Sequence, residues 1–168
     1  MYIARHDRIV DLIVKDISSN YSSSVKMYKD SCVKPSMFQN CNSSEAFSHV
    51  SANTPDVVVV NEEISEVFIV EVACTFDYSM EEAFMTKIIK YQPLLNIISE
   101  LGYQRRILVF IFGSLGHTHR LVVRGLQQLG MPKKRAKRLV MLNIVKICCV
   151  CDVFDCIYSI YVPVNRVF

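Results

Sequence analysis

Two carboxylates, each attached to a hydrophobic run, are the residues of this chain whose placement indicates chemistry. Glu71 lies in the middle of the run 67–74, and Asp56 directly precedes the run 57–60. A carboxylate among Val, Phe and Ile loses its water and needs a partner. Only residues 61–66 separate the two runs, and such a short connection favours an antiparallel strand pair that brings the acids together. Neighbouring carboxylates repel each other and a divalent cation relieves the repulsion, so the sequence predicts a metal-dependent site.

A predicted helix after Glu71 presents a polar face that could serve such a site. Lys87, Lys90 and Tyr91 are three or four residues apart, so their side chains project from one face of the helix. The alternative is that the two lysines belong to a solvated helix face. Their position directly after the two acids favours the functional interpretation.

Hydrophobic periodicity places the remaining elements around this pair of acids. Apolar residues at helical spacing predict a first helix at 5–17, and a third buried strand is predicted at 106–112. The Ser- and Asn-rich segment 18–54 is expected to be largely loop, with one early strand or turn near 26–30. C-terminal helices are predicted over about 115–157, divided near Gly130. These elements indicate an α/β fold in which helices flank a small central mixed sheet, and one domain over residues 1–168.

The helix that carries the lysines has its own boundary signals. Ser79-Met-Glu-Glu82 matches a capping box, which predicts the start of the helix at Ser79. The helix is expected to run to about Leu101, where Gly102 ends it. Pro93 is expected to kink or break it, because proline removes one hydrogen bond of the helix interior.

Composition limits the classes of protein to which this chain can belong. The chain has 168 residues, 51% of them hydrophobic and 21% charged, which suffices for a core and excludes disorder. The net charge of +3 permits a polyanionic partner without requiring one. Polar residues interrupt the apolar segment 139–162, so no run of about 20 apolar residues exists and no membrane span is expected. The seven cysteines, an odd number, and the charged start of the chain predict reduced thiols in an intracellular protein.

Four of these cysteines, Cys148, Cys149, Cys151 and Cys156, are close together near the end of the chain. They lack the second matched pair of cysteines that zinc sites of this kind use. Buried helix cysteines are therefore the favoured interpretation, and zinc is the alternative.

The order of these features resembles the PD-(D/E)xK nuclease superfamily. Pro55-Asp56, a strand, a turn, a strand with the central acid Glu71 and a helix with lysines follow one another as in that family. The usual lysine position, two residues after the second acid, holds Ala73 here. One branch moves the lysine to the following helix: the restriction-like endonuclease domain of target-site-specific non-LTR retrotransposons. The chain is most similar to this branch, with Lys87-Ile-Ile-Lys90-Tyr91 in the displaced position and Arg5-His6-Asp7 at its start.

The resemblance implies a function and the residues that perform it. Domains of this family nick target DNA, and the new 3′ end primes reverse transcription. By this resemblance Asp56 and Glu71 would hold Mg²⁺ or Mn²⁺, and Lys87 and Lys90 would supply the catalytic lysine function, with no preference between them. The partners implied are double-stranded DNA and, in a full element, retrotransposon RNA or a reverse transcriptase domain, which also favours a nuclear location.

Further residues are candidates for DNA contact. The resemblance implies a role near the DNA or the metal for Arg5, His6 and Asp7, and a position near the DNA for Tyr91. The densest basic run of the chain is predicted to contact phosphates, or alternatively to form a solvated first helical turn; it comprises Lys133, Lys134, Arg135, Lys137 and Arg138. His117 and His119 are expected at the surface rather than in a metal site.

Two alternatives to an active nuclease stay open. The first is a catalytically inactive retrotransposon-derived relic that keeps the fold and still binds DNA. The second is a structure-selective nuclease similar to Holliday-junction resolvases, which share the superfamily. Dimeric behaviour and preference for branched DNA would distinguish the resolvase-like protein.

Overall fold

A single sheet is the framework of this protein. The computed structural model describes residues 2–19, 21, 24–39, 41, 45 and 47–149, and the side chains of residues 2–5 and 142–149 lie outside this description. The elements are α1 (Tyr2–Ser18), β1 (Val25–Lys29), η1 (Pro35–Met37), β2 (Val57–Asn61), β3 (Glu66–Thr75), η2 (Asp77–Ser79), α2 (Met80–Glu100), β4 (Gln104–Gly113), α3 (Val122–Gln128) and α4 (Lys133–Cys149). The strand order is β1-β2-β3-β4; β3 and β4 are parallel and the other neighbours are antiparallel. The expected α/β fold with a small mixed sheet between helices is confirmed.

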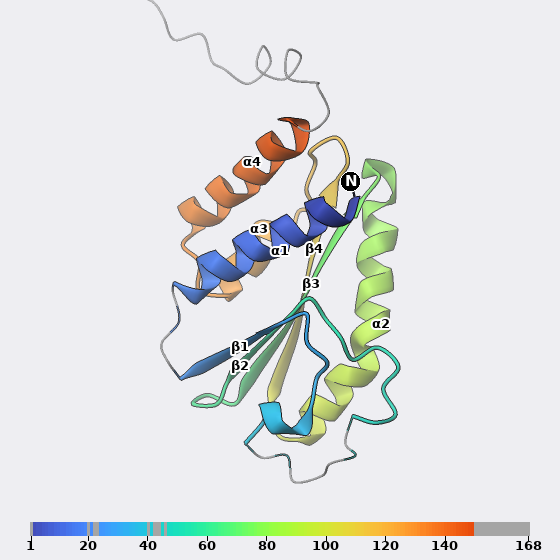
Figure 1. Cartoon of the computed structure of the whole chain (residues 1–168), viewed down its shortest axis with the longest axis vertical. Coiled ribbons are helices and arrows are strands. Elements are labelled where there is room, and N and C mark those ends of the chain that lie inside the picture. Colours follow the sequence, from blue (N-terminus) through green and yellow to red (C-terminus); the bar gives the residue numbers. More distant parts are fainter. Residues whose placement is uncertain are drawn as a thin grey trace, which may run out of the picture.

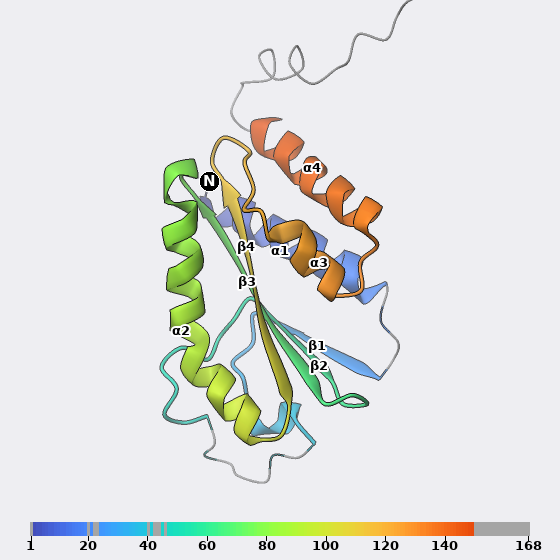
Figure 2. The same cartoon turned by 180° about the vertical axis from the view of Figure 1, so that it is seen from behind.

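Helices cover both faces of the sheet, which explains why β2 and β3 are apolar at nearly every position. α1, α3 and α4 lie on one face and α2 lies on the other (Figures 1 and 2). Side chains alternate along β3, so Phe68, Val70 and Val72 pack on the α1 side while Val67 and Ile69 pack on the α2 side. The same alternation directs Glu71 toward the face that α2 covers.

The first helix follows its apolar spacing. Ile9, Ile13 and Ile17 recur every four residues and are buried against the sheet. The predicted helix at 5–17 is therefore confirmed and extends to Tyr2–Ser18. The described residues of the long segment after it are largely loop, as expected, and its early strand is β1, which pairs with β2 at the sheet edge.

The boundaries of α2 agree with the prediction, but its predicted cap does not. Ser79 occupies the N-cap position without a capping hydrogen bond from its side chain, because its Oγ lies 3.0 Å from Thr75 Oγ1 and donates to Phe76 O. The capping box is therefore wrong. The helix ends before Gly102, whose φ of 86° suits glycine, and it continues unbroken through Pro93.

The predicted helix at 115–129 is also wrong in its first half, since α3 begins only at Val122. Residues 117–119 instead return along the end of β4: Gly113 N donates to His117 O, and His119 N donates to Ile111 O. These backbone bonds compete with a helix that local apolar spacing alone would favour. The last helix begins at Lys133, as predicted.

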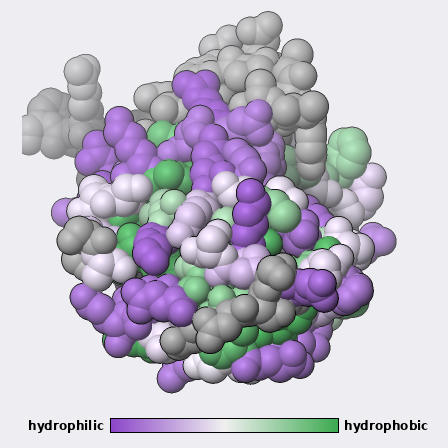
Figure 3. All heavy atoms as spheres, turned by 60° about the horizontal axis from the view of Figure 1, so that its bottom comes forward, coloured by the Kyte–Doolittle hydropathy of each residue, from purple (hydrophilic) through white to green (hydrophobic). Residues whose placement is uncertain are grey.

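The end of the molecule that lies at the bottom of Figure 1 is mostly hydrophilic, with small hydrophobic areas between polar side chains (Figure 3). Within the described residues, none of the helices has the length and apolar character that crossing a membrane requires.

Candidate functional site

The two predicted acids meet where β2 begins. The register pairs Val57 with Val70, so Asp56 lies opposite Glu71. The backbone N–H of Asp56 donates to Glu71 Oε2 at 3.4 Å, and Asp56 Oδ2 accepts a hydrogen bond of 2.6 Å from the N–H of Val72. β3 continues beyond this point while β2 does not, so the carboxylate of Asp56 takes the place of a strand neighbour. The antiparallel pair thus brings the acids together, as predicted.

Burial makes this proximity costly. The side chain of Glu71 is 3% exposed and that of Asp56 is 15% exposed. Burial and then the charge of Glu71 raise the pKa of Asp56, and they outweigh the hydrogen bond from Val72 and the neighbouring His6. Loss of water and repulsion between like charges thus both oppose ionisation of Asp56.

The two lysines of α2 approach the same carboxylate. Lys87 Nζ donates to Glu71 Oε1 at 2.5 Å, and Lys90 Nζ lies 3.8 Å from the same oxygen. The helical spacing that placed both lysines on one face therefore directs that face at Glu71. Glu71 is thus paired with two lysines of α2, of which Lys87 is the nearer.

Tyr91 lies beneath the two lysines and not at the surface. Its side chain is fully buried, its hydroxyl donates to Thr54 O at 3.1 Å, and it accepts a hydrogen bond of 2.9 Å from Lys90 Nζ. Burial and then the charge of Glu71 raise the pKa of Tyr91 far above its usual range, so the hydroxyl keeps its proton. The expected DNA contact of Tyr91 is corrected accordingly: the phenol connects Lys90 to the segment that precedes Asp56.

The start of α1 contacts Asp56 through His6. His6 Nε2 lies 3.2 Å from Asp56 Oδ2, and His6 Nδ1 lies 3.0 Å from Asp7 Oδ1. Burial lowers the pKa of His6, but the hydrogen bond and charge of Asp7 and those of Asp56 outweigh it and raise the pKa overall. Asp7 is exposed, and Arg5 lies in α1 with a side chain outside the described part.

The donor set fits a hard divalent cation. Within the described residues no hydrogen bond reaches Asp56 Oδ1, so one oxygen of this half-buried carboxylate stays available beside Glu71. Also within that part of the chain, no group of three or more His, Cys, Asp or Glu could hold a metal. Mg²⁺ is commonly held by one or two carboxylates, with water and substrate phosphates completing its shell. Two acids are therefore sufficient for Mg²⁺ and too few for a closed structural zinc site.

A second polar cluster, which the sequence did not indicate, lies beyond the end of β3. Asp77 accepts hydrogen bonds from the N–H of Leu115 at 2.9 Å, from Ser114 Oγ at 3.2 Å and from His117 Nδ1 at 2.5 Å. Burial raises the pKa of Asp77, but these bonds, above all that from Leu115, lower it overall. Asp77 thereby anchors the loop after β4. No local sequence signal identifies this contact, because its partners are far along the chain.

The two histidines of this loop differ from each other. The side chain of His117 is 72% exposed, as expected, but that of His119 is only 4% exposed, which corrects the prediction of a surface position. His119 Nε2 lies 2.6 Å from Glu81 Oε2, and its ring stacks on Phe84 with the centroids 4.4 Å apart. Both partners come from α2, so His119 fixes the loop to this helix.

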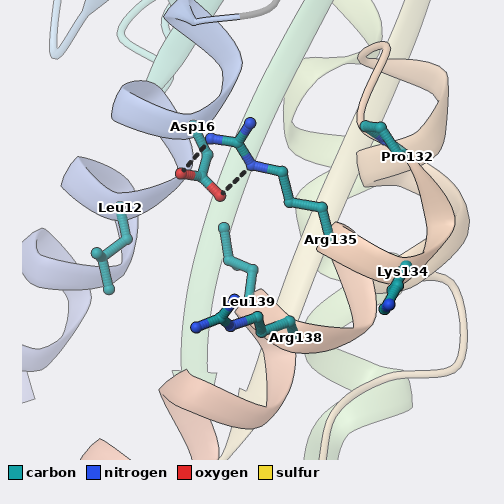
Figure 4. A pocket seen from close by; sticks show the side chains of 7 residues that line it. All are labelled: Leu12, Asp16, Pro132, Lys134, Arg135, Arg138 and Leu139. Atoms are coloured by element: carbon teal, nitrogen blue, oxygen red, sulfur yellow. Dashed lines mark hydrogen bonds and ion pairs between the residues drawn. The ribbon is translucent and has the colours of Figure 1, made fainter.

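The predicted basic run occupies the first turns of α4, where its cations are exposed. Arg135 differs from the others because it pairs with Asp16 on α1 at 3.1 Å (Figure 4). The run lies next to α1 and so on the opposite face of the sheet from the lysines of α2.

The arrangement offers one buried and one half-buried carboxylate, two converging lysines and one histidine, where β3 extends beyond β2. Such a set can hold a divalent cation and neutralise negative charge next to it. The side chains of the C-terminal cysteine cluster lie outside the described part of the structure. Neither a family model nor a curated protein sequence matches this chain.

Proposed function

We propose that this protein is a metal-dependent DNA endonuclease that nicks phosphodiester bonds, as in target-primed retrotransposition. The observation that carries the proposal is the convergence of Lys87 and Lys90 on Glu71, directly beside Asp56. This is the arrangement that the resemblance to restriction-like endonuclease domains of non-LTR retrotransposons requires. It forms from residues of β3, α2 and the segment before β2, which independent sequence features had indicated.

The two acids and the two lysines have different roles in the proposed reaction. Bound Mg²⁺ would supply an acidified water and charge neutralisation at a phosphate oxygen. Asp56 and Glu71 would hold it. Lys87 and Lys90 carry positive charge to the place where a phosphorane would accumulate negative charge. Of the two, Lys90 is the better candidate for contact with substrate, because it is 42% exposed and only 3.8 Å from Glu71, while Lys87 is committed to the ion pair.

His6 and Tyr91 act through these groups. His6 donates toward Asp56 Oδ2 and leaves Oδ1 available, so it fixes the orientation of the carboxylate. Tyr91 fixes Lys90 and the carbonyl of Thr54, two residues before Asp56. Both are therefore positioning residues for the proposed metal site.

Double-stranded DNA is the proposed partner, with retrotransposon RNA or a reverse transcriptase domain as partners in a full element. An intracellular and nuclear location follows from the proposed substrate.

The test is nicking of supercoiled plasmid by the full chain, with Mg²⁺ or Mn²⁺ compared with EDTA. Asp56→Asn is the test variant, because it removes the charge while its amide oxygen can still accept from Val72. Asp11→Asn is the matched control, since Asp11 is an exposed carboxylate paired with Lys29 away from the site. Metal-dependent nicking that is lost in Asp56→Asn and retained in Asp11→Asn supports the proposal.

Other outcomes separate the alternatives. A folded chain that binds DNA but does not cut it would indicate the inactive relic. Cutting that is confined to branched DNA and requires a dimer would indicate the resolvase-like nuclease. Nicking that survives in both Asp56→Asn and Glu71→Gln would contradict the assigned site.

A further inference from the structure

A groove between α1 and α4 lies apart from the candidate site. It has a volume of about 580 Å³ and is lined by Leu12, Asp16, Pro132, Lys134, Arg135, Arg138 and Leu139. Figure 4 shows Arg135 reaching from α4 to Asp16 on α1, with Arg138 extending from α4 toward α1. The carboxylate of Asp16 accepts from Arg135 at 3.1 Å and 3.3 Å, so the one acid of the groove lining is neutralised.

The basic run of α4 is divided between two sides of the helix. Lys134 and Arg138 are four residues apart and both line the groove. Lys133 and Lys137 are also four residues apart, but the groove lining does not include them. Arg135 pairs with Asp16 and so links α4 to α1. The run of five cations therefore contributes two free charges to the groove and two to another surface.

α1 connects the groove to the candidate site. His6, near the start of α1, reaches Asp56, whereas Leu12 and Asp16 line the groove. The rise of an α-helix places Asp16 about 15 Å from His6 along the axis. The exposed cations Arg8 and Lys15 lie four residues before and three residues after Leu12, so they share its side of α1. Two cations of α1 thus lie between the candidate site and the groove, and Asp11, the acid between them, is paired with Lys29.

We propose that this strip holds the phosphate backbone of the DNA that flanks the cleavage site. At about 3.4 Å per nucleotide, a separation of about 15 Å corresponds to roughly four nucleotides. The inference rests on the proposed nuclease function and adds to it the path of the substrate. The exposed cations Arg8, Lys15, Lys134 and Arg138 complement phosphates, and the ion pair of Arg135 with Asp16 links α4 to α1 beside them.

The test compares two double variants of the same helix. Lys134→Ala with Arg138→Ala removes the groove charges, and Lys133→Ala with Lys137→Ala removes equal charge from the other side of α4. Binding of the full chain to a fluorescent duplex is measured in EDTA over a series of salt concentrations. The groove variant is expected to lower the slope of log affinity against log salt by about 1.8, since each lost phosphate contact contributes about 0.9. The control variant is expected to leave the slope unchanged.

The outcomes are separable from those of the nuclease proposal because binding in EDTA needs no cleavage. Equal slopes for the two variants would overturn the groove as a DNA path, even if plasmid nicking by the full chain is confirmed. Loss of poly-glutamate binding in the groove variant, with DNA binding unchanged, would assign the groove to an acidic protein partner and also overturn the inference. Thermal unfolding at the wild-type temperature shows that either variant is folded.

Discussion

Replacement of Lys87 by methionine isolates the ion pair on which the candidate site depends. Methionine keeps most of the length and the apolar stem of lysine but leaves Glu71, 3% exposed, without its nearest cation. Removal of one partner of a buried ion pair costs about 3–5 kcal/mol, because the other charge stays buried. Lys87 is 28% exposed, and Glu71 keeps the N–H of Asp56 and the more distant Lys90, so we expect about 2 kcal/mol.

Lys90→Met is the matched control, since it removes the same charge from the same helix. Lys90 is 42% exposed and 3.8 Å from Glu71, and such exposed pairs contribute about 0.5 kcal/mol. For a chain of this size each kcal/mol lowers the unfolding temperature by about 2–4 °C. Lys87→Met should therefore unfold about 4–8 °C below the wild type and Lys90→Met about 1–2 °C below it.

Circular dichroism in EDTA at neutral pH measures both transitions, and urea unfolding gives the free energies. Adding Glu71→Gln to Lys87→Met should recover part of the loss, because the uncompensated charge is then gone. Equal unfolding temperatures for Lys87→Met and Lys90→Met would refute the assignment of Lys87 as the partner of Glu71. Failure of Glu71→Gln to recover stability would refute the reasoning that a buried charge causes the loss.

Three further predictions concern acids and one glycine. Asp56→Asn should raise the free energy of unfolding at neutral pH in EDTA, because the raised pKa of Asp56 means that ionisation of this carboxyl opposes folding. The difference between the variant and the wild type should vanish as the pH falls to about 3.8. Asp77→Asn should have the opposite effect and lower the free energy of unfolding by about 1.5 kcal/mol at neutral pH. This loss of stability should disappear as the pH falls through the lowered pKa of Asp77. Gly113→Ala should lower the free energy of unfolding in urea by about 1–3 kcal/mol, because the new Cβ would overlap the carboxylate of Asp77. Wild-type stability in Gly113→Ala, or identical pH profiles for the two Asp variants, would contradict these assignments.

The sequence predicted the part of the site that depends on local pattern and chain connectivity. A short link between two apolar runs sufficed to place Asp56 opposite Glu71, since a hairpin leaves little choice of register. Helical spacing sufficed to place Lys87 and Lys90 on one face. Both inferences concern residues that are close in sequence, and the structure brings all four side chains together.

Contacts between distant segments were not predictable in the same way. Asp77 anchors residues 114–117, and this contact, with the return of the chain along β4, replaced the helix expected from Leu115 onward. His119 was expected at the surface because it follows Gly113-Ser-Leu-Gly116 near a predicted helix start, yet Phe84 and Glu81 of α2 contact it. Tyr91 shared the helix face of the lysines, but its burial depends on how closely that face approaches the sheet.

The division of the basic run into two surfaces also required the structure. From the sequence, Lys133 to Arg138 is a single block of charge. The position of α4 against α1 commits Arg135 to Asp16 and leaves Lys134 and Arg138 in the groove. This distinction makes a charge-matched control possible within one helix.

Calorimetric titration of Mn²⁺ into the full chain tests the central claim, that Asp56 and Glu71 form a cation site, without relying on cleavage. We expect one binding site in the wild type and in Asp11→Asn, and its loss in both Asp56→Asn and Glu71→Gln. Retention of the same binding in all four proteins would place the cation elsewhere and contradict the account.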